Sequence, residues 1–362
     1  MQRIGRVAAT LVVALLVLYA LLGYRDVLNP ESAGPAGEFV AVAEKPPPVA
    51  LDPLYVAHQV RPALVNIDVG TSAFGSGAAG SGIVLTADGQ ILTSHHVIKG
   101  AERVQVTDIA TELNYEATVL GYDSTADIAL LSLAGAAELP TARIGTSAEL
   151  RMRQEVLAIG DAGGDGGAPT AVAGPITDLD ASIVAMNSAD LTRKSLRGMV
   201  EVAAPVVGGQ SGGALADGTG AVVGVITAAS GERGSDDRRA TPANGYAVPI
   251  DKAMRIVDQI RSGVPTDTVH VGPTASLGVQ IVDAKPSGAQ VSWAFYGQPA
   301  RAAGIVDGDV ITAVDGESIT TAQSLSAAVH RRSPGDVVLL DITAPDGATR
   351  TIKVVLARGT PN

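Results

Sequence analysis

The sequence predicts a mainly β protein, with an all-β segment of sandwich or barrel type followed by a smaller α+β domain. Short runs rich in Val and Ile recur between turn residues, which is the spacing of such an all-β segment. The chain has 42 glycines in 362 residues, where about 25 would be usual, and only 3% aromatic residues. We therefore expect turn-rich architecture around an aliphatic core. The strand–helix alternation that a parallel sheet requires is absent from the pattern.

Composition and charge exclude several classes of function. Hydrophobic residues make up 46% and charged residues 17%, so the chain can bury a core and wholesale disorder is excluded. The formal charge of −11 argues against nucleic acid as a partner, since phosphate binding needs clustered Lys and Arg. The lack of cysteine excludes disulfides, thiolate metal sites and Cys nucleophiles. No metal or cofactor is expected, because the sequence shows no metal cluster, phosphate loop or cofactor signature.

The N-terminal residues 1–25 predict a cytoplasmic N-terminus and a transmembrane anchor. Two arginines precede an uncharged apolar run of eighteen residues, 7–24, which reaches the lower edge of the roughly 17–25 residues that span a bilayer. The alternative is a cleaved secretory signal, but the nearest small-x-small sequence, 41–43, lies far beyond the run. We expect an uncleaved single-pass anchor in the cell membrane, with the rest of the chain on the extracytoplasmic side.

Residues 26–52 form an expected Pro-rich linker, which would hold the folded part away from the membrane. A first domain is expected over 53–263. Asp52 can cap a helix that has Pro53 at its first position and runs to about Val60. Strands are expected over 63–69, 81–86, 90–93, 103–106, 117–120, 127–133, 154–159 and 221–228.

A helix is expected to close the first domain, with Asp251 as its N-cap, an apolar face and Gly263 at its end. Residues 264–274 hold two prolines and predict a linker. The following segment, 275–358, alternates strands with one helical stretch at 321–331, which predicts the α+β domain.

Ser211 lies among glycines in the sequence Gly209-Gln210-Ser211-Gly212-Gly213. A serine in such a loop lets main-chain N–H groups approach a reacting carbonyl, although Gly–Ser clusters also occur as plain flexible loops. The pattern G-x-S-x-G also occurs in α/β-hydrolase esterases, which need the order Ser, acid, His. Only His270 and His330 follow Ser211, in a linker and at a helix end, and the strand–turn–helix context is missing. The esterase interpretation is therefore disfavoured.

The opposite chain order, His–Asp–Ser, is that of chymotrypsin-like double barrels. His95 and His96 stand where the strand 90–93 ends, and Asp127 stands at the head of the apolar strand 127–133. Each has a plain alternative, as a polar strand end or a turn residue. Their order on an all-β background predicts a Ser–His–Asp hydrolase.

These motifs resemble the HtrA/DegP family of trypsin-like serine proteases, and most of all its mycobacterial secreted or membrane-bound type. The resemblance is carried by residues 80–84, 92–98, 126–131 and 209–215 for the protease, and by 276–279, 298–305 and 308–316 for a PDZ domain. It implies a chymotrypsin-like double β-barrel, with six strands in each barrel and the active site between them, followed by the PDZ domain.

The resemblance also implies roles for single residues. Ser211 is the nucleophile, and His96 is the general base, because the pattern T-x-x-H-V selects it over His95. Asp127 orients His96, and Asp123 is a nearby turn residue. The main-chain N–H groups of Gly209 and Ser211 form the oxyanion hole.

Two residues depart from the family pattern. Gln210 stands where the family usually has Asn, and Ala203 stands where it commonly has Asp, which puts the support of the nucleophile loop in doubt. The glycine-rich stretch 160–167 is either a mobile regulatory loop or a long surface connection.

Specificity and partners follow from the same reasoning. No acidic residue occupies the six positions before Ser211, so we expect cleavage after small or medium aliphatic residues. The expected S1 pocket is lined by Val206, Val225, Ile226 and Thr227. In the PDZ domain, the N–H groups of Leu277, Gly278 and Val279 would receive the carboxylate of C-terminally exposed polypeptides. A homotrimer is the assembly that the resemblance implies.

The sequence thus predicts a membrane-anchored, extracytoplasmic serine endopeptidase that degrades or processes unfolded envelope proteins and is regulated by peptide binding to the PDZ domain. The alternative is a catalytically silent PDZ-based chaperone or peptide-binding scaffold, for which Ala203 leaves room.

Overall fold

The structure is a computed structural model that describes residues 47–70, 78–164, 166–186, 193–229 and 244–361. The expected anchor at 1–25, and the linker up to residue 46, lie outside the described residues. Within the described ranges, none of the helices is both long enough and apolar enough to cross a membrane.

The first six strands form a closed ring. They are β1 (Leu64–Gly70), β2 (Ala78–Val84), β3 (Gln90–Thr93), β4 (Arg103–Asp108), β5 (Asn114–Asp123) and β6 (Ile128–Leu133). Their order is β5-β4-β1-β2-β3-β6, and pairing of β5 with β6 closes the ring. Alternation along β1 places Val65 and Ile67 inside this barrel, whereas Leu64 belongs to a cluster shared with the second barrel.

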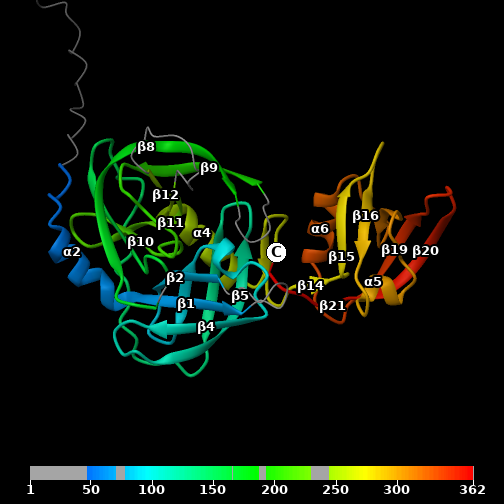
Figure 1. The fold of residues 1–362 in the computed structure, drawn as a ribbon, viewed down its shortest axis with the longest axis horizontal. Helices are drawn as coiled ribbons and strands as arrows, with labels where there is room; N and C mark the ends of the chain where they lie inside the picture. Colours follow the sequence, from blue (N-terminus) through cyan, green and yellow to red (C-terminus); the bar gives the residue numbers. More distant parts are fainter. Residues whose placement is uncertain (1–46, 71–77, 165, 187–192, 230–243, 362) are drawn as a thin grey trace, which may run out of the picture. The chain divides into compact units, whose positions relative to one another are not determined.

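The second barrel is also closed, in the order β10-β11-β12-β9-β8-β7. Its strands are β7 (Glu155–Gly160), β8 (Thr170–Met186), β9 (Arg193–Val202), β10 (Ala214–Ala216), β11 (Val222–Ala229) and β12 (Gly245–Pro249). The β8–β9 ribbon is drawn in green in Figure 1. From the sequence, no strand was expected over 170–202, because polar residues interrupt the apolar alternation of this stretch. In the structure, the pairing of β8 with β9 shifts register near Asp178 and Ala181.

The helix expected after Asp52 is confirmed as α2 (Pro53–Val60), with the Asp52 carboxylate accepting from Leu54 N and Tyr55 N at 3.1 Å. The expected cap of α4 (Ile250–Arg261) is wrong, because the helix begins at Ile250 after Pro249. The Asp251 carboxylate binds the segment 146–148 instead, accepting from Thr146 Oγ1, Ser147 Oγ and Ala148 N at 2.8–2.9 Å.

Residues 264–274, which were expected to be a linker, contain a strand. This strand, β13 (Val269–Val271), pairs with β5 through Val269 and Asp123. The side chain of Val269 is buried, so the first domain extends beyond its expected end at residue 263.

The C-terminal α+β domain has its own core, separate from the clusters of the barrels. Its main sheet has the order β15-β16-β17-β19-β20, and β15 lies at one edge. The strands are β14 (Ala275–Ser276), β15 (Val279–Asp283), β16 (Ala289–Ala294), β17 (Val310–Val314), β18 (Glu317–Ser318), β19 (Val337–Thr343), β20 (Thr349–Val355) and β21 (Ala357–Arg358). The helices are α5 (Pro299–Ala302) and α6 (Ala322–His330), and Thr321 caps α6 as part of a capping box.

Candidate active site

His96 lies in α3 (His95–Ile98), the short helix that follows β3. Its main-chain N–H donates to Asp127 Oδ1 at 3.0 Å, and its ring Nδ1 is 2.8 Å from Asp127 Oδ2. The neighbouring His95 is buried, and its ring packs on Tyr122 with centroids 4.7 Å apart. Burial lowers the pKa of His95 to about 3, so that ring is neutral. The structure thus pairs Asp127 with the histidine that the sequence pattern selects.

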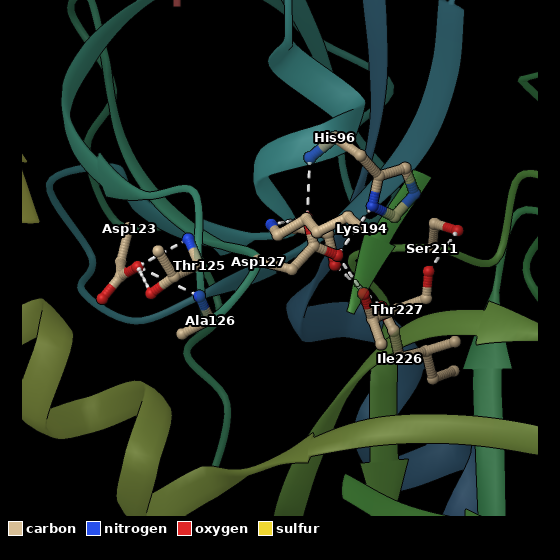
Figure 2. Close-up of polar contacts among 10 residues, drawn as sticks. His96, Asp123, Thr125, Ala126, Asp127, Lys194, Ser211, Ile226 and Thr227 are labelled. Carbon is tan, nitrogen blue, oxygen red and sulfur yellow. Dashed lines mark hydrogen bonds and ion pairs between the residues drawn. The ribbon is translucent and has the colours of Figure 1, made fainter. Parts of the chain in front are cut away.

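Asp127 lies in the turn that enters β6, and only 3% of it is exposed. The turn is held by Asp123, whose Oδ1 accepts from Thr125 N, Thr125 Oγ1 and Ala126 N. Besides His96, Asp127 accepts a hydrogen bond from the Thr227 hydroxyl. Figure 2 shows His96 and Thr227 around the Asp127 carboxylate, with Asp123, Thr125 and Ala126 in the turn beside it.

The two groups shift each other's pKa in opposite directions. Burial alone lowers the pKa of His96, but the charge of Asp127 and its hydrogen bond raise it, and the net pKa lies above the usual value. Burial alone raises the pKa of Asp127, but the charge of His96, with further hydrogen bonds, brings it well below its usual range. The pair therefore favours a carboxylate beside an imidazole that protonates readily.

Ser211 lies in the loop before β10, in the second barrel. Its carbonyl accepts from Ser81 N of the first barrel at 2.8 Å, so the loop is fixed against both barrels. Its hydroxyl donates to the main-chain oxygen of Thr227 at 3.4 Å. Among the described residues, no hydrogen bond joins Ser211 Oγ to His96, although Figure 2 places the imidazole between Asp127 and Ser211.

The peptide between Gly208 and Gly209 has a fixed orientation. The Gly208 carbonyl accepts from Gly163 N at 2.8 Å, so in a planar trans peptide the Gly209 N–H points away from Gly163. Within the described part of the chain, the N–H groups of Gly209 and Ser211 donate to no protein acceptor. The glycine-rich stretch 160–167 is thus in direct contact with the nucleophile loop, through Gly163.

Gln210 supports the nucleophile loop from inside. It is fully buried, its Oε1 accepts from Val207 N at 3.0 Å, and its Nε2 donates to Thr170 Oγ1 at 3.2 Å. Thr170 begins β8, so this side chain links the loop to the barrel wall. Ala203 has no side-chain hydrogen-bonding group, and its main-chain N–H donates to Pro175 O at 3.0 Å.

The structure does not gather the four expected S1 residues on one surface. Val225 is fully buried in the cluster shared by the barrels, whereas Val206 and Ile226 belong to the core of the second barrel. The Thr227 hydroxyl is bound to Asp127. All four residues are buried, and the S1 lining stays a prediction.

The expected carboxylate loop precedes β15. The Gly278 N–H donates to Ser276 Oγ at 3.0 Å, and Leu277 O accepts from Ala300 N at 2.9 Å. Val279 begins the edge strand, opposite Ala294. The Gly278 N–H is thus paired with the Ser276 hydroxyl, and the carboxylate site at these residues stays a prediction.

Sequence reasoning missed Lys194, whose Nζ lies 3.9 Å from Asp127 Oδ1. It also did not predict the hydrogen bond from Thr227 to Asp127. Neither residue belongs to a motif, and only the pairing of β11 and of β9 with β12, which lies between them in the second barrel, brings them to Asp127.

Comparisons with known proteins identify both domains. The trypsin-like peptidase domain model matches residues 80–225, and the PDZ domain model matches 275–356. Serine protease PepD of Mycobacterium tuberculosis is 32% identical over 349 residues, which cover 91% of this chain and 72% of PepD. The chloroplastic Protease Do-like 1 of Arabidopsis thaliana is 31% identical, over 74% of this chain and 61% of that protein.

A probable periplasmic serine endoprotease, DegP-like, of Pseudomonas fulva is 30% identical over 76% of this chain. The chain spans only 55% of that relative's length. A solved HtrA-type protease, AlgW with a tripeptide, is 24% identical, with a TM-score of 0.49 over 86% of this chain and 98% of that one. The family models and the match to PepD show that this chain is a serine endopeptidase of the PDZ-containing, trypsin-like HtrA family.

Proposed function

We propose that the protein is a membrane-tethered, extracytoplasmic endopeptidase that degrades or processes unfolded envelope proteins, with Ser211, His96 and Asp127 as its catalytic triad. The observation that carries the triad is the 2.8 Å contact between His96 Nδ1 and Asp127 Oδ2. It fixes the proton on Nδ1 and leaves Nε2 free of that proton, as a general base requires.

Catalysis begins when the Ser211 side chain rotates from the Thr227 carbonyl toward His96 Nε2. His96 takes the hydroxyl proton while Ser211 Oγ bonds to the peptide carbonyl carbon. The same proton then passes to the leaving amine as the C–N bond breaks, which leaves an acyl-enzyme. In deacylation a water molecule gives a proton to His96 and attacks the acyl carbon, and the proton then returns to Ser211 Oγ as the ester bond breaks. Asp127 stabilises the imidazolium that forms in acylation and in deacylation. Loss of Ser211 or His96 would lower kcat by about 10⁶.

The oxyanion that forms on the carbonyl needs two donors. The N–H groups of Gly209 and Ser211 suit this role, because they are adjacent to the nucleophile. The hydrogen bond from Gly163 N to Gly208 O also holds the Gly208–Gly209 peptide, which carries the first of these N–H groups, in one orientation. A preorganised donor of this kind is worth about 10²–10³ in kcat. The proposed cleavage after small or medium aliphatic residues is supported by the absence of an acidic residue from the six positions before Ser211.

The PDZ domain would bind the C-termini of exposed polypeptides by adding a strand to the free edge of β15, with the carboxylate at Leu277, Gly278 and Val279. Occupancy of this site would raise proteolysis. The extracytoplasmic location rests on the apolar run 7–24 and on DegP-like relatives whose names call them periplasmic. A homotrimer is the assembly proposed for the chain.

Labelling with a fluorophosphonate, which reacts only with an activated serine, tests the triad directly. We expect the purified protein to be labelled, the Ser211→Ala variant to lose the label, and His96→Ala to react at least about 10³-fold more slowly. Ser147→Ala is the control, because Ser147 binds Asp251 away from this site. Labelling that persists in Ser211→Ala would contradict the assignment.

A further inference from the structure

Lys194 lies on β9 and extends toward the buried carboxylate of Asp127 (Figure 2). Its Nζ is 3.9 Å from Asp127 Oδ1, and the two side chains are 33% and 4% exposed. The same oxygen accepts the main-chain N–H of His96 at 3.0 Å. The carboxylate that orients His96 therefore faces a second cation from the opposite barrel.

The two cations share one negative charge. Coulomb energy falls only with the first power of distance, and partial burial weakens screening by water. A cation beside Asp127 stabilises the carboxylate, but it repels a proton on His96. In accordance with this, the charge of Asp127 raises the pKa of His96 while the charge of Lys194 lowers it.

Other titratable groups face the same cluster. They are His95 and Lys99 from α3 and its end, Asp123 from the end of β5, and Lys252 from α4. Burial lowers the pKa of Lys194, as do Lys99 and Lys252, whereas Asp127 and Asp123 act to raise it. Lys194 is the lysine in direct contact with Asp127, while the Lys252 ammonium donates to the carbonyl of Arg197 at 3.0 Å.

We propose that Lys194 is a positioning residue that weakens the hold of Asp127 on a protonated His96, so that His96 becomes a neutral base at lower pH than the His96–Asp127 pair alone would allow. The proposal rests on the assignment of His96 as the general base. Lys194 touches neither substrate nor Ser211 in this scheme, and acts by its charge on the His96–Asp127 pair.

The test is an NMR titration of the His96 ring protons between pH 4 and 9, in a Ser211→Ala background that prevents self-digestion. The variants are Lys194→Met, Lys194→Gln and Lys194→Arg, with Lys252→Met as the matched control. We expect Lys194→Met and Lys194→Gln to raise the His96 midpoint by about 0.5–1 pH unit, the size of one near-surface charge. Lys194→Arg and Lys252→Met should stay close to the parent.

With Ser211 restored, the midpoint of the acid side of the kcat/KM profile should move to higher pH by the same amount in Lys194→Met. In Lys194→Arg, this midpoint should stay at the parent value. A purely structural role would lower kcat/KM without moving the midpoint. An unchanged His96 midpoint in Lys194→Met and Lys194→Gln, or an equal shift in Lys252→Met, would overturn the proposal. Absence of hydrolysis in the unsubstituted protein would count against the proposed function alone, because the NMR titration needs no turnover.

Discussion

At the scale of single residues, one buried carboxylate organises the active site. Asp127 accepts two hydrogen bonds from His96 and one from Thr227, and Lys194 lies beside it. A buried charge is stable in a protein only when it is paired and hydrogen-bonded. The partners of Asp127 therefore decide the protonation of His96.

The raised pKa of His96 sets the expected pH dependence of activity. His96 must be neutral to accept the Ser211 proton, so kcat/KM for a peptide substrate should fall as the pH is lowered through a midpoint above 6.5. Asp127 has a lowered pKa and stays ionised throughout that range. Steady-state assays between pH 5 and 9 measure the midpoint, and a value at or below 6.5 would contradict the pairing.

Asp127→Asn should lower kcat by about 10⁴.

Sequence alone could predict the residues that sit in motifs. His96, Asp127 and Ser211 each occur in a short local pattern, and the structure brings His96 and Asp127 into contact. Thr227 and Lys194 could not be assigned, because their tasks depend on which face of a strand points to Asp127. That face is set by register and by bulges such as the one between Ile226 and Ala228, which no local pattern records.

At the scale of elements, the nucleophile loop is fixed by contacts that leave no room for side chains. Gly212 has φ +83°, and a Cβ there would lie 2.1 Å from Ser81 O and 2.3 Å from Thr93 Oγ1. Gly212 N also donates to Ile226 O at 2.7 Å. The glycines after Ser211 thus allow the two barrels to meet at the nucleophile.

A Gly212→Ala substitution should therefore destabilise the protein by about 2–5 kcal/mol, from strained backbone and overpacking together. Gly135→Ala is the matched control, because Gly135 has φ +74° but nothing within 4 Å of its Cβ position. It should cost only about 1–2 kcal/mol. Urea unfolding followed by circular dichroism compares the two, and equal losses would show that close packing at Gly212 is unimportant.

Helix ends show where local sequence rules succeed and where they fail. Asp52 caps α2 as expected, and its carboxylate accepts from Leu54 N and Tyr55 N. Asp251 does not cap α4, since its carboxylate binds the hydroxyls of Thr146 and Ser147. These two lie more than a hundred residues away, so tertiary contact overrides the local preference.

At the scale of the whole molecule, residue patterns predicted the fold class but left sandwich and barrel open. Barrel closure depends on strand pairs that sequence spacing does not specify, such as β5 with β6 and β10 with β7. The family resemblance supplied the double barrel, and the structure confirms it. The boundary at residue 263 was too early, because β13 forms only by pairing with β5.

This boundary determines how PDZ regulation should be tested. A truncation after Pro273 removes the PDZ domain but keeps Val269 packed and β13 paired, whereas one after Val264 would also strip β13 from the first barrel. In the full chain, we expect a peptide with an apolar C-terminal residue to raise hydrolysis of a short fluorogenic substrate, and its amidated form to have no effect, since amidation removes the carboxylate charge.

The truncation after Pro273 should keep basal hydrolysis, because the triad, the nucleophile loop and both barrels remain. It should lose the response to the free-acid peptide. Circular dichroism establishes that the truncated protein is folded before the comparison is made. An undiminished response after removal of 274–362, or equal stimulation by free-acid and amidated peptides in the full chain, would show that the effect of the peptide does not pass through a carboxylate site at Leu277, Gly278 and Val279.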